Sequence, residues 1–199
     1  MAEKLRLFVS ATNDLEAERA VIGRAVADLP ISIGIEIRRT PATGASYDDI
    51  FELVANVDRV YFLLGRDITA PAGAEWHWAW KLERSVWPLA STAVRSPAAQ
   101  EFMRSALVKW RTFRSSGELA RLVTLDLARI LNHPTNRYGL SVTEMELLAL
   151  HAKRVTQRGG SGVMPGDPGG AQGGGVLLDL AETATMDGEE LNSELLTEP

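Results

Sequence analysis

The sequence predicts a three-layer α/β/α fold, in which helices cover both faces of a parallel sheet of four to five strands. Short apolar runs typical of buried strands alternate along the chain with segments of helical periodicity. The run at 60–64 (VYFLL) is apolar at consecutive positions, as expected for a central parallel strand with helices on both sides. Right-handed crossovers between the strands then place helices on both faces.

The first half of the chain is expected to contain three strands and two helices. The strands cover residues 5–10 (LRLFVS), 33–37 (IGIEI) and 59–64 (RVYFLL). The first helix begins at Asn13, which forms a capping box with Glu16, and it ends at Pro30. Its apolar stripe consists of Ala17, Ala20, Val21, Ala25 and Leu29. A loop rich in turn-forming residues (RRTPATGAS) precedes the second helix, which begins at Ser46 or Tyr47.

The segment 75–84 (EWHWAWKLER) fits two patterns. At period two its tryptophans share one face of a strand, whereas at helical spacing Trp76 and Trp80 lie one turn apart. We predict a helix, because the alternating strand–helix series requires one here. A fourth strand is expected over 86–94, and Pro88 favours either its start or a position at the edge of the sheet.

Two further helices are expected before the domain ends. Ser96 and Pro97 supply a cap and a first-turn proline for a helix that continues past Trp110. Ser115 and Glu118 form a capping box at the start of the last strongly apolar helix, which ends at residue 131.

The chain is expected to contain one compact domain followed by a tail. The domain covers residues 1–132, and one extra helix lies within 133–158. Residues 159–175 are rich in glycine and are expected to form a flexible linker. Residues 176–199 carry acidic residues and no Lys or Arg, and we interpret them as a disordered tail.

The composition excludes several kinds of site. The chain has no cysteine, which excludes a disulfide framework, a thiolate zinc site and a cysteine nucleophile. With a net charge of −5, nucleic acid is not an expected partner, and the basic residues within 104–121 are interpreted as a solvated helix surface. No apolar run approaches the roughly 18 residues of a membrane span, so we expect no membrane association and a cytoplasmic location. The three histidines are far apart in sequence, and no metal site is expected.

The opening LRLFVSATNDLEAER resembles that of an uncharacterised TIR-like domain family, whose members typically begin with FVSST, an aromatic residue and DLxxER. The matching residues are Phe8, Val9, Ser10, Thr12, Asp14, Leu15, Glu16, Glu18 and Arg19. Residues 57–65 resemble the third strand of the family, Glu75 falls where the family has a Glu after that strand, and SGELARLVTLDLARIL resembles its closing helix. The resemblance covers residues 4–132 and implies a flavodoxin-like or TIR-like sheet.

The chain also departs from the family pattern. The segment between Thr12 and Asp14 is one residue shorter and lacks the aromatic residue, and RDITAPAGA replaces the usual Tyr-Gly after the third strand. Family members often precede signalling ATPases of the NACHT/STAND type. The resemblance therefore implies self-association, a signalling ATPase or another defence protein as partner.

Related folds include TIR domains that cleave NAD and nucleoside deoxyribosyltransferases, which both act on an N-glycosidic bond with a carboxylate. Breaking that bond leaves an oxocarbenium-like sugar, which a fixed carboxylate can stabilise. The resemblance makes Glu75 the candidate catalytic residue. Ligands of parallel sheets bind at the carboxyl ends of the strands, here 10–13, 38–45 and 65–74. The candidate ligand-binding residues are Ser10, Thr12, Asn13, Arg39, Gly65, Arg66 and Trp76.

The expected function is that of a TIR-like signalling or defence domain that binds a nucleotide such as NAD, with cleavage of the N-glycosidic bond as its candidate activity. NAD is expected as a substrate, and no cofactor is required. Two alternatives remain, because fold alone does not separate them: a non-catalytic interaction module and a nucleoside deoxyribosyltransferase-like enzyme. Both enzyme hypotheses require Glu75 to face an open cleft, whereas a solvent-facing or ion-paired Glu75 favours the module.

Overall fold

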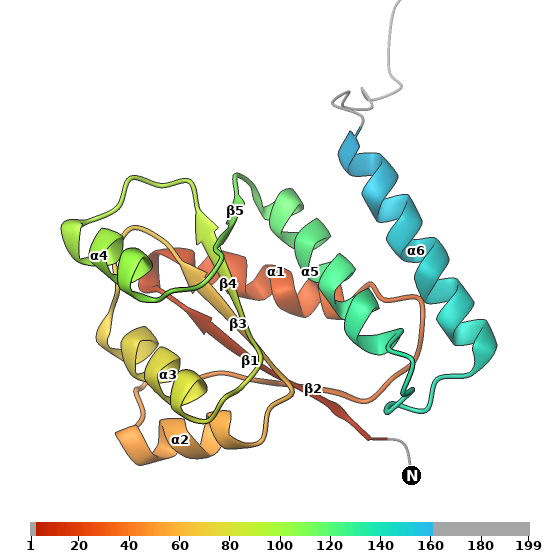
Figure 1. Cartoon of the computed structure of the whole chain (residues 1–199), viewed down its shortest axis with the longest axis horizontal. Coiled ribbons are helices and arrows are strands. Elements are labelled where there is room, and N and C mark those ends of the chain that lie inside the picture. Colours follow the sequence, from red (N-terminus) through yellow and green to blue (C-terminus); the bar gives the residue numbers. More distant parts are fainter. Residues whose placement is uncertain (1–2, 161–199) are drawn as a thin grey trace, which may run out of the picture. The chain divides into compact units, whose positions relative to one another are not determined.

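Residues 3–160, which the computed structural model describes, form the predicted three-layer α/β/α fold (Figure 1). Within this range five parallel strands form one sheet in the order β2-β1-β3-β4-β5. They are β1 (Leu5–Ala11), β2 (Ile35–Arg38), β3 (Arg59–Leu64), β4 (Val86–Ser91) and β5 (Arg111–Phe113). The strand order reverses between β1 and β3, because β2 lies on one side of β1 and the later strands lie on the other. Parallel sheets bind ligands at such a switch in strand order.

Helices cover both faces of this sheet. On one face lie α1 (Glu16–Ala27) and α5 (Ser116–Leu131), and on the other lie α2 (Tyr47–Ala55), α3 (Ala70–Lys81) and α4 (Pro97–Ser105). The helix α6 (Val142–Gly160) packs against α5 and corresponds to the extra helix expected within 133–158. The compact unit runs from Met1 to Gly162 and so includes this helix. The expected linker from residue 161 and the tail at 176–199 lie outside the described residues.

Successive side chains of β1 and β3 point to opposite faces of the sheet, so both strands contribute to the core on each face. Leu7, Val9 and Leu63 pack toward α1 and α5, whereas Phe8 and Phe62 pack toward α2, α3 and α4. Ser10 lies two residues after Phe8 and therefore faces the same side as α3. This places its hydroxyl on the helix layer that contains Glu75.

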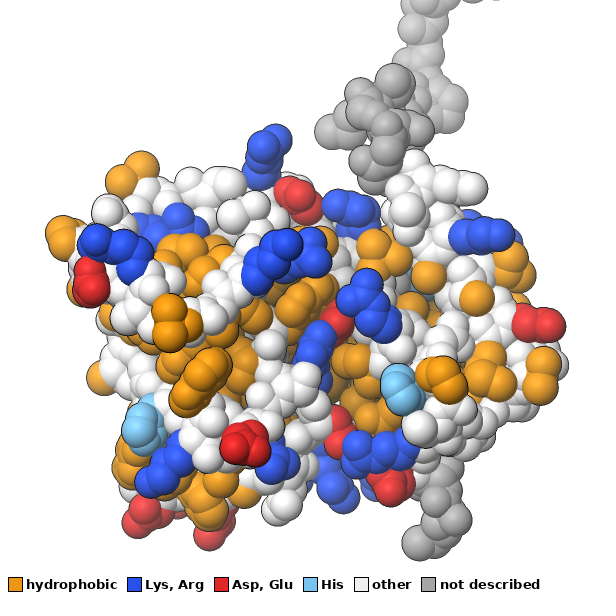
Figure 2. Space-filling model, in the orientation of Figure 1, with side chains coloured by type: hydrophobic (Ala, Val, Ile, Leu, Met, Phe, Trp, Pro, Cys, Tyr) orange, Lys and Arg blue, Asp and Glu red, His pale blue; other side chains and the backbone are white. Residues whose placement is uncertain are grey.

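Several local predictions are confirmed. The segment 75–84 is helical as far as Lys81, within α3. Ser46 caps α2 with a complete capping box, and Ser96 caps α4 with Pro97 in its first turn. The basic residues within 104–121 are exposed or partly exposed as expected, but only Arg104 and Arg121 lie on helices, since Arg111 is in β5 and Lys109 and Arg114 flank it. Lys and Arg side chains gather over β5 and α5 on the face seen in Figure 2.

The start of α1 differs from the prediction. A short 3-10 turn (Asn13–Leu15) precedes the helix, and the expected capping box of Asn13 and Glu16 does not form, because the Glu16 carboxylate pairs with Arg19 and Arg39 instead. Ala17 and Ala20 of the predicted stripe are exposed, and Ile22 is buried in their place.

The other corrections concern the second half of the chain. The helix α3 begins at Ala70, five residues before the predicted start at Glu75, so the second half of the segment RDITAPAGA is helical. The helix predicted to pass Trp110 ends at Ser105, and the strand β5, which was not predicted, follows at Arg111. Pro88 lies inside β4, in the third position of the strand. It is tolerated there because β5 pairs with β4 only from Leu89 onward, which leaves one side of Pro88 without a neighbouring strand.

Candidate functional site

Glu75 lies in the middle of α3 and is buried, with 2% of its surface exposed. Its Oε2 accepts a hydrogen bond from the Ser10 hydroxyl at the end of β1, and its Oε1 accepts one from the Thr40 hydroxyl just after β2. Three segments that are distant in sequence therefore meet at one carboxylate. Each carboxylate oxygen retains capacity for another donor, because an ionised carboxylate offers about four acceptor positions.

The Glu75 carboxylate has no cationic partner. It forms no salt bridge among residues 3–158, and both of its hydrogen-bond donors are neutral hydroxyls. Burying a carboxylate without a cation is costly for folding. Groups kept in such surroundings cluster at functional sites.

A pocket of about 240 Å³ lies beside this carboxylate, between α2 and the start of α3. Its walls are mostly small or apolar, and they include the residues Thr40, Gly44, Ala45, Tyr47, Ile50, Ala70, Pro71 and Ala74. Thr40 is the lining residue that also contacts the Glu75 carboxylate, and Ala74 directly precedes Glu75. The pocket and the carboxylate are thus separated by the Thr40 side chain.

A second group of polar contacts joins the carboxyl ends of β1 and β3. The Gly65 amide donates to Thr12 Oγ1 (2.9 Å), and the Thr12 hydroxyl donates to Asp14 Oδ1 (2.7 Å). The Arg66 amide donates to Asp14 Oδ2 (2.8 Å). A Cβ atom at Gly65 would lie 2.1 Å from Asp14 Oδ2, so this close approach requires glycine.

The structure places four of the predicted ligand-binding residues at this edge of the sheet. Ser10 contacts Glu75, while Thr12, Gly65 and Arg66 belong to the network around Asp14. The hydroxyls of Ser10 and Thr12, which were predicted to bind a ligand, donate to carboxylates instead. The Arg66 side chain is exposed and lines a separate pocket of about 300 Å³.

The remaining three predicted residues form no hydrogen bond with Glu75 or Asp14, although Asn13 and Arg39 are next to contacting residues in sequence. Asn13 is exposed in the 3-10 turn, and exposed Arg39 pairs with Glu16 at 3.1 Å. Trp76 points into the core between α3 and α4, where its ring stacks on that of Trp110 with centroids 5.8 Å apart. The structure therefore gives Trp76 a packing role and does not bring it to the carboxylate.

The sequence reasoning missed Thr40 and the acceptor role of Asp14. Thr40 lies in the loop 38–45 that the carboxyl-end rule marked, but the same loop contains Thr43, and no local pattern separates the two. Asp14 was part of the family resemblance without an assigned role. Asp14 accepts hydrogen bonds from the Thr12 hydroxyl, two residues earlier, and from the Arg66 amide, which is 52 positions away in sequence.

A second buried carboxylate, Asp126 on α5, lies at the amino end of β3. The Arg59 guanidinium contacts both of its oxygens, and the Tyr61 hydroxyl donates to Oδ2 at 3.1 Å. Burial, together with the Asp126 charge, raises the pKa of Tyr61 well above its usual value. This group is fully paired and lies far from the carboxyl ends of the strands.

No family model, curated protein or solved structure matches the chain. Within the described part of the chain, no helix is long and apolar enough to cross a membrane. The functional argument therefore depends on the fold and on the contacts of Glu75.

Proposed function

We propose that the chain is a TIR-like signalling or defence domain that binds a nucleotide such as NAD and cleaves its N-glycosidic bond. The observation that supports this most directly is the Glu75 carboxylate, which is buried with two neutral donors, has no cationic partner among residues 3–158 and borders a pocket. It lies at the carboxyl edge of the sheet, where this class of fold binds its ligands.

The chemistry explains why such a carboxylate is useful. Cleavage of the N-glycosidic bond builds positive charge on the sugar, and a carboxylate that is already fixed in place stabilises this charge without reorganisation. Ser10 and Thr40 fix the orientation of Glu75 without neutralising it. The acceptor capacity left on each oxygen is available to the ribose hydroxyls.

The pocket restricts which part of a nucleotide it takes. Its volume of about 240 Å³ is below the roughly 300 to 1,000 Å³ of pockets that hold drug-sized ligands. It therefore accommodates a base or a sugar and leaves the phosphates outside. A ligand in the pocket reaches Glu75 by replacing the hydrogen bond from Thr40.

The test is release of nicotinamide from NAD by the full chain, measured by proton NMR. Signalling enzymes of this type often need assembly, so the assay uses high protein concentration and a crowding agent. Glu75→Gln keeps the shape of the side chain and removes its charge, and it should lower the rate by about a hundredfold or more. Glu101→Gln, on the exposed surface of α4, is the matched control and should retain the wild-type rate.

Equal release by wild type and Glu75→Gln would remove Glu75 from this role. A deoxyribosyltransferase-like activity uses the same carboxylate, and it is distinguished by incubating the protein with a deoxyribonucleoside and a second free base. Transfer of deoxyribose without nicotinamide release would favour that alternative. The interaction module predicts a solvent-facing or ion-paired Glu75, and neither arrangement is found within residues 3–158. The enzyme hypotheses require Glu75 to face an open cleft, whereas Glu75 is buried and does not itself line the neighbouring pocket.

A further inference from the structure

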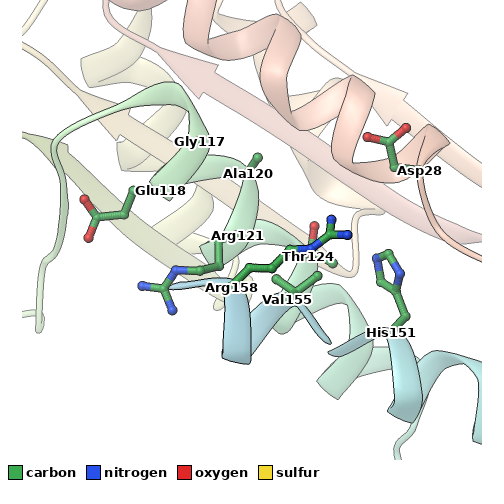
Figure 3. A pocket seen from close by; sticks show the side chains of 9 residues that line it. All are labelled: Asp28, Gly117, Glu118, Ala120, Arg121, Thr124, His151, Val155 and Arg158. Atoms are coloured by element: carbon green, nitrogen blue, oxygen red, sulfur yellow. The ribbon is translucent and has the colours of Figure 1, made fainter. Parts of the chain in front are cut away.

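A larger cavity lies on the opposite face of the sheet from Glu75, between the end of α1, α5 and α6. We call it the α5–α6 cavity. Its volume is about 520 Å³, within the range of pockets that bind small molecules. The lining residues that carry the argument are Asp28, Arg121, Thr124, His151, Val155 and Arg158 (Figure 3).

Helical spacing brings these side chains to facing surfaces. Arg121 and Thr124 are three residues apart on α5 and share one face. His151, Val155 and Arg158 follow at spacings of four and three on α6 and share the face opposite. Figure 3 shows the Arg158 side chain extending across the cavity toward Thr124.

Thr124 has an unusual environment for a threonine inside a helix. It is 7% exposed and lines the cavity, and its hydroxyl makes no hydrogen bond among residues 3–158. By contrast, the Thr156 hydroxyl on α6 donates to the Ala152 carbonyl at 2.9 Å. The Thr124 oxygen is not among the buried side-chain atoms without a hydrogen-bond partner, so it is open to the cavity, where its hydroxyl can donate to an acceptor.

Two arginines that line the cavity, Arg121 and Arg158, can donate to an anion. Neither Arg121 nor Arg158 forms a salt bridge within the described range. Guanidinium groups bind phosphate oxygens through paired hydrogen bonds, and a threonine hydroxyl adds a third donor. Asp28 and His151 lie apart from each other on the side of the cavity toward which Arg158 extends in Figure 3, and each can bind a hydroxyl group.

We propose that the α5–α6 cavity binds a small phosphate monoester. Arg158 and Thr124 hold the phosphate, and Asp28 and His151 contact the hydroxyl groups of the organic part. The Arg121 side chain also lines the cavity, but in Figure 3 its guanidinium points away from Thr124. The site is independent of Glu75, because the sheet lies between them. It gives the domain a place for a phosphorylated small molecule that is separate from the proposed nucleotide site.

The test is a titration of the full chain with ribose 5-phosphate, followed by amide chemical shifts in proton–nitrogen NMR spectra. Binding should saturate and shift amides of α5 and α6, and ribose should cause no such shifts. Arg158→Gln and Thr124→Val should each weaken the affinity roughly tenfold, since each removes a donor to a charged group. Glu75→Gln should bind as wild type does.

Two matched variants serve as controls. Arg154→Gln removes an exposed arginine of α6 that does not line the cavity, and Thr156→Val removes the hydroxyl bonded to Ala152. Both should keep the wild-type affinity. Unsaturable shifts, equal shifts with ribose, or unchanged affinity in both Arg158→Gln and Thr124→Val would overturn the proposal. Thermal melting of each variant verifies that it is folded.

Discussion

Glu75 and Asp126 are equally buried, at 2% exposure, but they are held in opposite ways at opposite edges of the sheet. Asp126 meets the Arg59 guanidinium and the Tyr61 hydroxyl at the amino end of β3. Glu75 meets two neutral hydroxyls at the carboxyl end of β1 and has no cation among the described residues. The first carboxylate is compensated within the protein, whereas the second is not.

The difference separates a charge that is compensated within the fold from the charge that the proposed reaction uses. A buried ion pair lets the chain keep a charge inside the core with little net effect on stability, but removing one partner exposes the full desolvation cost of the other. A buried carboxylate without a cation has no such structural justification. Its charge remains available to a positively charged sugar, which is what the proposed reaction requires.

The largest expected effect follows from removing the cation of the compensated pair. Arg59→Met leaves Asp126 buried and unpaired, and it should lower the free energy of unfolding by about 3 kcal/mol, the lower end of the range for broken buried pairs. We take the lower end because the Arg59 side chain is 16% exposed. Urea denaturation measures the loss. The double variant Arg59→Met with Asp126→Leu should recover most of it, and a double variant as unstable as the single one would contradict the pairing argument.

At the carboxyl ends of the strands, the Asp14 carboxylate occupies the space that a Cβ atom at Gly65 would need. Gly65→Ala forces the Asp14 carboxylate away from the Thr12 hydroxyl and the Arg66 amide, and the loss of these bonds should cost about 2 kcal/mol. Gly23→Ala is the control, because a Cβ there meets nothing within 4 Å and the residue lies inside α1. It should stabilise the protein by up to about 1 kcal/mol. Thermal unfolding of both variants distinguishes the two outcomes.

The contact of Tyr61 with the Asp126 carboxylate can be tested by the pH dependence of stability. Because its pKa is raised in the folded protein, by burial first and then by the Asp126 charge, an unfolded chain releases this proton near pH 10 while the folded one retains it. Stability should therefore fall as the pH rises above about 10. Tyr61→Phe should cost about 1 kcal/mol at neutral pH through its lost hydrogen bond. The stability of Tyr61→Phe, measured by urea denaturation midpoints, should fall less steeply above pH 10 than that of the wild type. An equally steep decline would show that Tyr61 does not cause it.

The smallest expected effect is the most informative. Glu75→Gln should change the free energy of unfolding by less than about 1 kcal/mol, or increase it, because the charge that it removes is uncompensated and the hydroxyls of Ser10 and Thr40 can also accept hydrogen bonds. Asp126→Asn should cost about 2 kcal/mol, since Arg59 loses its charged partner. Urea denaturation at neutral pH compares them. Equal losses in the two variants would remove the distinction between the carboxylates.

The main part of the fold could be predicted because its signals are local. The apolar run of β3 and the alternation of strands with helices were enough to place the sheet, and the carboxyl-end rule marked the segments that supply Ser10 and Thr40. Glu75 directly follows the third marked segment and was singled out by the family resemblance. The choice of partners within those loops was not predictable. It depends on which side chains meet once the strands are in register, as the difference between Thr40 and Thr43 illustrates.

Other features are set by tertiary contacts alone. β5 has three residues, Arg111, Thr112 and Phe113, of which only Phe113 is buried, and it is a strand because β4 offers it hydrogen-bonding partners. Arg59 and Asp126 are 67 positions apart, so no motif connects them. Trp76 resembled a ligand-stacking residue by its place next to Glu75, but neighbours on a helix point about 100° apart and enter different surroundings.

The stacked rings of Trp76 and Trp110 give the domain an optical signal of its own. Their planes are inclined by 12° and their centroids are 5.8 Å apart, so the two indoles are close enough for their electronic transitions to couple. One ring belongs to α3 and the other to the segment between α4 and β5. Trp76 also stacks on Trp80 within α3, with centroids 6.3 Å apart and planes inclined by 12°. The part of the circular dichroism signal that is lost in Trp110→Phe therefore reports when the segment before β5 docks on α3, without an attached label.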